Sequence, residues 1–263
     1  SELASAYGIA VTGDMVITSA LAFMLFLRAW KWPLALAIAV VGPLMALELV
    51  FLGANALKVF DGGYIPILIA STMVLLMWSW LRGSAHVLTQ ARRGAVTIEQ
   101  LAAMLAKSSR LVNVPGTAVF LTSDPEMAPA ALTHNIKHNQ VLHAQNLIVG
   151  VNMVTRPYVE DADRLEITPI SDRFTRVDLN FGYMEEPNVP KALALARKKG
   201  IKYDIMTPSF FLNRRSFKSA SKGGLPLWQE NIFRMLSRSA ADATHFYRLP
   251  TNRVIELGQQ LTI

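Results

Sequence analysis

The sequence predicts a two-part fold, in which an α-helical membrane part with three transmembrane helices precedes an α/β domain. Three observations support this prediction. Long apolar stretches fill residues 1–82. Charged residues become frequent only afterwards, since residues 1–81 hold three Lys or Arg against four Asp or Glu in a chain of net charge +7. From residue 97 onwards, strand patterns alternate with helix patterns, which is typical of one compact α/β domain.

The stretch at 64–81, YIPILIASTMVLLMWSWL, is the clearest predicted span. It contains no charged residue and is followed at once by Arg82. Eighteen helical residues extend over about 27 Å, which is close to the hydrocarbon thickness of a bilayer. Trp78 and Trp80 suit the membrane interface. Pro66 is compatible with the helix because it lies in the first turn, where its missing N–H has no helical partner.

Two earlier stretches, at about 6–27 and 33–57, are also apolar and long enough to cross a bilayer. The turn between them carries Arg28 and Lys31, whereas the turn at 58–63 holds one Lys and one Asp. The positive-inside rule therefore places the first turn on the cytoplasmic side.

The same rule places Arg82 and everything after it in the cytoplasm, and it places Ser1 outside. The chain has no signal peptide and no initiating Met at this outer start. We therefore expect it to begin in the middle of a larger membrane protein.

Two carboxylates, Asp14 and Glu48, lie well inside the first and second predicted spans. A charged carboxylate at such a depth costs on the order of 3 kcal/mol on insertion scales, so each is expected to face the protein interior or to be protonated. Both are candidate transport residues for protons or cations. The alternative is a helix–helix hydrogen bond, or for Asp14 a cap at a helix break after Gly13.

Composition narrows the classes of function. The chain is 52% hydrophobic and 17% charged, with no cysteine, which excludes disulfides and thiolate metal sites. Its mean hydropathy of +0.30 is high for a soluble protein. Because the basic second part adjoins a membrane, anionic lipid headgroups are more natural neighbours than nucleic acid, for which no motif is present.

After the spans, we expect a polar linker at 83–96 and a domain at 97–263. Thr97 and Gln100 form a capping-box pattern that opens a helix. The remaining predicted elements are strands at 116–122, 146–154, 173–183 and 253–263, and helices at 129–139, at 189–199 and around Trp228, Ile232, Met235 and Leu236.

Two of these elements have a predicted buried face. Period-two alternation in 173–183 places Val177, Leu179, Phe181 and Tyr183 on one side of a half-exposed strand. In the helix at 189–199, the inward residues are Val189, Leu193 and Ala196.

Three groups of polar residues are candidates for chemistry. His134 and His138 are one helical turn apart, with His143 nearby, which fits a metal site or simply a polar helix end. Glu185 and Glu186 fit an acid–base pair, or a helix N-terminal region whose dipole favours carboxylates. The basic residues at 197–202, Arg214, Arg215, Lys218 and Lys222 suit a nucleotide or lipid phosphate, or a solvated surface, but no P-loop or G-x-G-x-x-G accompanies them.

Six segments together resemble the Kup potassium uptake transporters of the KUP/HAK/KT family, in the same order and over essentially the whole chain. They are SAYGIAVTGDM at 5–15, LVFLGANALKVFDGGYIPI at 49–67, VPGTAVFLT at 114–122, LTHNIKHNQVLH at 132–143, FGYMEEPNVP at 181–190 and NRVIELGQQ at 252–260.

The resemblance implies a secondary active transporter rather than an enzyme, importing potassium with protons across a bacterial inner membrane and needing no cofactor. It implies an APC/LeuT-like fold of about twelve spans, built partly from inverted repeats. The present chain is similar to the last three spans and the cytoplasmic domain, so the potassium ligands are expected in earlier spans. The resemblance implies that Asp14 and Glu48 are polar residues of the spans, but it gives them no defined role.

The resemblance also implies a regulatory or dimerising role for the second part, with a cyclic dinucleotide as a possible ligand and a homodimer as a possible assembly. The rival interpretation is a membrane-anchored α/β protein, acting as a nucleotide-binding sensor, regulatory module or enzyme. A structural anchor for a partner complex is a third interpretation of the second part.

Overall fold

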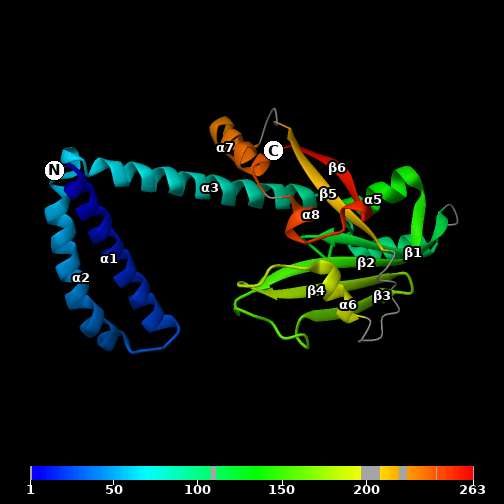
Figure 1. Cartoon of the computed structure of the whole chain (residues 1–263), viewed down its shortest axis with the longest axis horizontal. Helices are drawn as coiled ribbons and strands as arrows, with labels where there is room; N and C mark the ends of the chain where they lie inside the picture. Colours follow the sequence, from blue (N-terminus) through cyan, green and yellow to red (C-terminus); the bar gives the residue numbers. More distant parts are fainter. Residues whose placement is uncertain (1, 108–110, 197–207, 219–223, 241, 263) are drawn as a thin grey trace. The chain divides into compact units, whose positions relative to one another are not determined.

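The computed structural model describes residues 2–107, 111–196, 208–218, 224–240 and 242–262, and it divides into two compact units that meet between Ser79 and Trp80 (Figure 1). The first unit is helical. The second contains a six-stranded sheet with its helices. Three long apolar helices and a separate α/β unit are thus present, as the sequence predicts.

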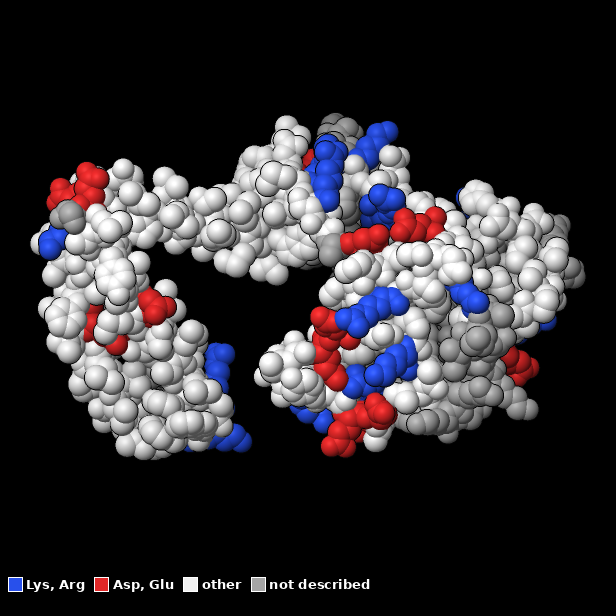
Figure 2. Space-filling model, in the orientation of Figure 1, with Lys and Arg blue, Asp and Glu red and all other residues white. Residues whose placement is uncertain are grey.

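The helical unit contains α1 (Glu2–Arg28), α2 (Leu34–Ala56), the short 3-10 turn η1 (Val59–Asp61) and the first part of α3 (Tyr64–Arg92). All three long helices have the length and composition needed to cross a membrane, with mean hydropathies of 1.9, 2.4 and 1.8 over an 18-residue window in each. Charged side chains are sparse on α1 and α2 in Figure 2. The three predicted spans are therefore present as helices.

Small residues allow the elements of this unit to approach closely. A Cβ on Gly63 would collide with Ile9 of α1, and one on Gly8 would lie 2.7 Å from the Asn55 side chain of α2. At the opposite end of the pair, Phe26, Trp30 and Trp32 stack around the turn that carries Arg28, with ring centroids 4.5 to 5.6 Å apart. Aromatic rings beside cationic residues are typical of a membrane interface.

Helix α3 continues to Arg92, so most of the segment 83–96, expected as a polar linker, is helical. The composition changes at Arg82, but backbone hydrogen bonding does not depend on an apolar sequence. The segment GSAHVLTQAR has no proline to interrupt it. The backbone is no longer helical at Gly94, whose φ of +77° lies in the left-handed region that favours glycine.

The sheet has the strand order β3-β4-β2-β1-β5-β6. Its strands are β1 (Val112–Thr122), β2 (Val141–Val154), β3 (Leu165–Ser171), β4 (Phe174–Gly182), β5 (Ser209–Lys218) and β6 (Val254–Thr262). Every neighbouring pair is parallel except β3 and β4, which form an antiparallel edge.

Both faces of the sheet are buried, which explains its continuous apolar runs. On one face, Phe120 and Ile148 pack with α4 (Ile98–Ala106) and α5 (Ala130–His134). On the other, Val119 and Leu147 pack with α6 (Val189–Ala196) and with residues around α8 (Ala243–Phe246). Helix α7 (Leu227–Arg238) packs instead near the end of α3.

The predicted faces are mostly confirmed. Val177, Leu179 and Phe181 of β4 are buried, and so are Val189, Leu193 and Ala196 of α6; residues 197–199 of the predicted helix lie outside the described residues. Tyr183 is 61% exposed, against prediction, because β4 ends at Gly182 and the chain turns there. The predicted helix at 129–139 is α5 followed by a π-helical turn (Asn135–Asn139).

The topology of the sheet places a switch point between β1 and β5. From β1 the chain adds β2 and then β4 on one side, and later returns to add β5 and β6 on the other side. Pairing between β1 and β5 covers only three residue pairs and stops at Phe120 and Phe211, although both strands continue. The carboxyl ends of the two strands therefore separate, and this is where open α/β sheets bind ligands.

The first turn of α4 supplies a test of local stability. The Thr97 hydroxyl accepts a hydrogen bond from the Gln100 N–H, and the Gln100 side chain accepts one from the Thr97 N–H, each at 3.3 Å. Thr97→Ala is expected to cost about 1 kcal/mol and to speed amide exchange in this turn about fivefold. Thr97→Ser keeps the hydroxyl and is expected to exchange like the original chain. Equal exchange in both variants would contradict this assignment of the cap.

Candidate functional site

Glu48 and Ser19 join two of the apolar helices through a hydrogen bond. The Ser19 hydroxyl of α1 donates to Oε1 of Glu48 on α2 at 2.9 Å. The second carboxylate oxygen, Oε2, is buried and has no hydrogen-bond partner among the described residues. One oxygen therefore fits the structural alternative of a helix–helix bond, and the other retains unused capacity to bind a proton or a cation.

Asp14 is placed differently. It lies on an exposed side of α1 within the helical unit, and among the described residues none forms a hydrogen bond or ion pair with it. The helix runs unbroken from Glu2 to Arg28, so the alternative that Asp14 caps a break after Gly13 is wrong. The carboxylate is thus presented to whatever adjoins α1.

The second unit contains a crevice at the switch point of the sheet. Its volume is about 760 Å³, and its floor comes from the end of β1 with Thr122, Ser123 and Asp124. Asn213 and Arg215 of β5 form one wall. The other walls come from residues 80–96, α7 and the segment containing α8. The lining combines hydroxyl, amide and guanidinium groups with apolar side chains, as in small-molecule sites.

Arg215 is one of three arginines that line this crevice, together with Arg92 and Arg93. Its guanidinium lies 3.5 Å from the Ser123 hydroxyl and forms no ion pair with any described carboxylate. Arg215 is exposed by its accessible surface, yet partial burial of its side chain lowers the pKa of Arg215 from its ordinary value. Arg92, by contrast, already bonds Asp124 at 2.7 Å. An arginine without a carboxylate partner, next to a hydroxyl, suits an anionic group such as a phosphate.

The other residues of the predicted basic surface have different partners and different exposure. Arg214 points to Glu256 of β6, with 3.3 Å between the charged groups, and Lys218 is exposed at the end of β5. The predicted residues at 197–202 and Lys222 lie outside the described residues. Arg214 and Arg215 are thus adjacent in sequence but differ in partner.

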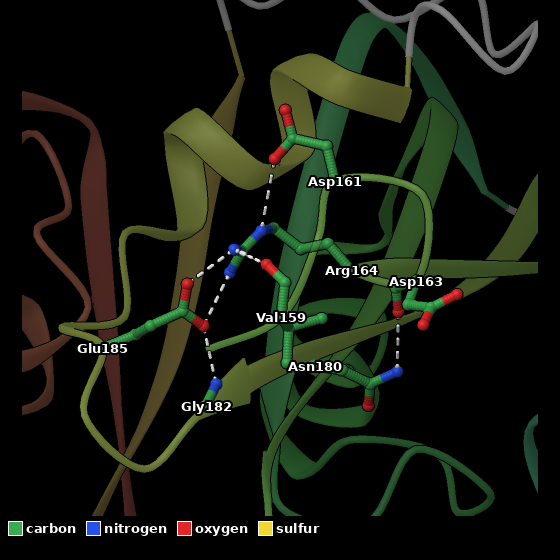
Figure 3. A network of polar contacts seen from close by, with 7 residues as sticks. All are labelled: Val159, Asp161, Asp163, Arg164, Asn180, Gly182 and Glu185. Carbon is green, nitrogen blue, oxygen red and sulfur yellow. Dashed lines mark hydrogen bonds and ion pairs between the residues drawn. The ribbon is translucent and has the colours of Figure 1, made fainter. Parts of the chain in front are cut away.

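Glu185 and Glu186 do not form the acid–base pair that the sequence offered as one possibility. Glu185 bonds Arg164 through both oxygens, at 2.7 and 3.1 Å, and accepts the Gly182 N–H at 2.6 Å (Figure 3). Glu186 pairs with Arg248 instead. The bonds from Arg164 hold the pKa of Glu185 below its usual range. Glu185 lies in the turn after β4, where its N–H donates to the Gly182 carbonyl at 3.0 Å, and Glu186 follows this turn.

Figure 3 shows that this network ties a loop to the end of β4. Arg164 also donates to the Val159 carbonyl, and the Asn180 side chain donates to the Asp163 carbonyl at 3.3 Å. A Cβ on Gly182 would collide with the backbone at Pro157, so glycine is required for this close approach. The network is structural and fixes the loop between β2 and β3.

The histidines show no metal geometry. The rings of His134 and His138 lie 5.8 Å apart, and the described residues contain no cluster of three His, Cys, Asp or Glu side chains that would hold a metal ion. His143 lies in β2 against Phe211, with ring centroids 5.9 Å apart. Burial lowers the pKa of His143, so it is neutral at physiological pH.

Sequence reasoning did not single out Ser123, Arg164 or the crevice itself. The signal for the crevice is the TSD sequence that directly follows a buried strand, since polar residues at carboxyl ends of parallel strands gather at one edge. No comparable signal marks Arg164, because its partner Glu185 is distant in sequence.

The Arg164–Glu185 pair makes the stability of the domain dependent on pH. Because the folded pKa of Glu185 is below its ordinary value of 4.5, its contribution is complete above pH 4.5 and is lost as pH falls through the lowered pKa. Glu185→Gln should lower the melting temperature at pH 7 and flatten its acid dependence. The control is Glu186→Gln, whose carboxylate is 76% exposed and should matter little. Identical acid profiles for the original chain and Glu185→Gln would contradict the assignment.

Comparison with known proteins supplies the family. A model described as the K+ potassium transporter integral membrane domain matches residues 1–85. A second, described as the K+ potassium transporter C-terminal domain, matches residues 115–263. No solved structure matches the chain.

Several relatives are similar over the full chain. It is 49% identical to a probable potassium transport system protein Kup of Rhizobium rhizogenes, over 99% of this chain and 42% of the relative. It is 48% identical to Kup 2 of Mesorhizobium japonicum, over 100% of this chain and 41% of the relative, and 45% identical to Kup of Brucella anthropi, over 100% and 40%. The chain thus spans about two fifths of the length of these relatives. The chain belongs to the K+ potassium transporter family, because two models of that family match it and it is similar to these proteins over its whole length.

Proposed function

We propose that this chain forms the C-terminal part of a potassium importer that couples entry of K+ to entry of protons. The observation that carries the proposal is the succession of an integral membrane domain and a C-terminal domain of potassium transporters within one chain. Relatives named as potassium transport proteins share close to half of its residues. The proposed activity is secondary active transport without a cofactor.

The proposed location is a bacterial inner membrane, with α1, α2 and the first part of α3 as the last three spans of an APC/LeuT-like transporter. The α/β domain, 97–263, lies in the cytoplasm in this proposal. Arg28 and Lys31 support this orientation because they flank the turn between α1 and α2, where Trp30 and Trp32 form an interfacial aromatic group. The transporter rocks between outward-open and inward-open states around an ion site in earlier spans.

Within this proposal, Glu48 is the better placed of the two transport candidates. Its buried Oε2 needs a partner, which a proton, a cation or a group from an earlier span would supply. Asp14 faces outward from the pair of helices described here, so its role depends on the neighbour it meets. The rival, a free-standing anchored sensor, receives no support from the three relatives described above, which are named as transport proteins.

The C-terminal domain is proposed to regulate transport, alone or as a homodimer, by binding an anionic effector. A cyclic dinucleotide fits the chemistry of the switch-point crevice, which offers Arg215, Ser123 and Asn213 beside apolar walls. The lack of a described carboxylate partner for Arg215 supports this assignment.

Potassium uptake by the intact transporter tests the role of Glu48. Glu48→Gln keeps the shape of the side chain but cannot ionise, so we expect uptake to fall about tenfold and to lose its pH dependence. Ser19→Ala removes only the helix–helix hydrogen bond and is expected to change uptake about twofold or less. The assay measures potassium-dependent growth and rubidium uptake in a strain without other potassium importers. Unchanged uptake and pH dependence in Glu48→Gln would assign the residue to packing; Asp14→Asn is measured in the same way.

Calorimetry of the chain in detergent with cyclic dinucleotides tests the regulatory site. Arg215→Ala should weaken binding about tenfold, because a charge-assisted hydrogen bond to phosphate is lost. Arg214→Ala is the matched control, since Arg214 already pairs with Glu256 and its side chain is 79% exposed. No heat at millimolar ligand, or equal weakening by both substitutions, would reject the site.

A further inference from the structure

A second hollow adjoins the switch-point crevice on the side of α7. It has a volume of about 600 Å³ and lies between β5 and the last turns of α7, beside the start of α8 (Figure 1). The residues that line both hollows are Leu212, Asn213, Arg215, Phe217, Ser237, Ala240 and Ala243. Each volume is within the range of about 300 to 1,000 Å³ that is usual for small-molecule sites. The two hollows are therefore neighbouring parts of one depression, and we call the second the α7 groove.

Aromatic packing fixes the two walls of the α7 groove. Phe217 of β5 lies against Phe233 of α7, with ring centroids 5.3 Å apart. Phe233 also lies 5.5 Å from the ring of Trp80 and packs with Val87 of α3. A Cβ on Gly83 would collide with the Phe233 ring, so α3 and α7 approach closely here. The walls thus have a defined separation before a ligand binds, which lowers the cost of ordering them on binding.

Cations outnumber carboxylates along the α7 groove. The charged residues of its lining are Arg214, Arg215, Arg234, Arg238, Asp242 and Glu256. Glu256 pairs with Arg214 at 3.3 Å, and Arg234 pairs with Glu230 of its own helix at 3.2 Å. Asp242 accepts the Thr244 N–H at 3.0 Å and so caps α8. Arg215 and Arg238 form no ion pair with a carboxylate in the described part of the chain, so their charges are available to an anion.

Ser237 is the second feature of α7 that indicates a ligand. Arginines near the carboxyl end of a helix are favourable for the helix dipole alone. The Ser237 hydroxyl, however, is buried and has no hydrogen-bond partner among the described residues. A serine in a helix ordinarily donates to a carbonyl one turn earlier, as Ser239 does to the Met235 carbonyl at 3.2 Å. An acceptor on a ligand in the groove, which Ser237 lines, would satisfy this hydroxyl after a change of its rotamer.

We propose that the α7 groove is the second phosphate subsite of an effector that carries two separate phosphate groups. One phosphate binds Arg215 and Ser123 at the switch point, and the other binds Arg238 and Ser237 of α7. This inference rests on the proposed function, in which the domain binds an anionic effector. It adds that a ligand with one phosphate satisfies only one of two arginines that have no described carboxylate partner and line adjoining hollows.

Calorimetry of the full chain in detergent with two nucleotides tests the subsite. Cyclic di-AMP carries two phosphates and cyclic AMP carries one, with the same base and sugar. We expect the chain to bind cyclic di-AMP at least tenfold more tightly. Arg238→Gln should weaken binding of cyclic di-AMP about tenfold and leave binding of cyclic AMP unchanged, because only the second phosphate loses a charge-assisted hydrogen bond. Arg215→Ala should weaken binding of both nucleotides.

Two further variants separate the subsite from general effects of charge and folding. Arg156→Gln removes the same charge from an exposed ion pair with Asp163 in the loop between β2 and β3, and it should change neither affinity. Ser237→Ala removes a hydroxyl that has no described partner, so the melting temperature of the free chain should not fall. The increase in melting temperature that cyclic di-AMP causes should nevertheless become smaller in Ser237→Ala, because the ligand binds less tightly.

Three results would overturn the proposal. Equal loss of affinity in Arg238→Gln and Arg156→Gln would show a general effect of charge. Unchanged affinity for cyclic di-AMP in Arg238→Gln, together with weakening in Arg215→Ala, would confine the effector to the switch-point crevice and leave the proposed function standing. Absence of binding of either nucleotide to the original chain would reject the regulatory site itself, and the subsite with it. Circular dichroism checks that each variant remains folded.

Discussion

The rest of the structure depends on the uninterrupted backbone hydrogen bonding of α3 across the point where its sequence changes from apolar to polar. A helix in hydrocarbon must satisfy its backbone internally, and this helix keeps the same pattern after Arg82, where the sequence becomes polar. Its polar end is then available for contacts within the second unit. Gly83 receives Phe233, Arg92 pairs with Asp124, and residues 80–96 wall the switch-point crevice. A flexible linker would provide none of these fixed positions.

An effector bound as proposed would contact residues of α3, because residues 80–96 line the crevice. A ligand held by Arg215 and Ser123 would lie against the same end of α3 that carries Arg92. Binding shifts a transport equilibrium only if the ligand has different affinities for two arrangements of these residues. The crevice is suited to such a difference because its walls come from separate elements, whereas the Arg164–Glu185 network holds the opposite part of the sheet in one arrangement.

Sequence reasoning succeeded where one local pattern determines the structure. The charge-free run at 64–81 predicts a helix of spanning length, the capping box at Thr97 predicts the start of α4, and the alternation around Val177 predicts a buried face. It was less successful where a polar composition did not end a helix, as in the segment after Arg82, which remains helical. Strand β5 was missed because its apolar first half is followed by Arg214 and Arg215, which resemble a loop in sequence but pair with β6.

The candidate site was predicted only in part for a similar reason. Asp14 and Glu48 stand out because carboxylates are rare in apolar stretches, but the bond from Ser19 depends on how two helices face each other. The separate partners of Glu185 and Glu186 also depend on tertiary structure. The switch-point crevice becomes visible only once the strand order is known, because β1 and β5 are far apart in sequence.

The central claim is that this chain belongs to a proton-coupled potassium importer, and simultaneous flux measurement tests it most directly. The intact transporter is purified and reconstituted into vesicles that hold a pH-sensitive dye, and an outward potassium gradient is imposed without any pH difference. The account predicts that potassium leaving the vesicles carries protons out with it, so that the interior becomes alkaline. Potassium efflux without proton movement would contradict coupling, and no potassium flux above that of empty vesicles would contradict transport itself.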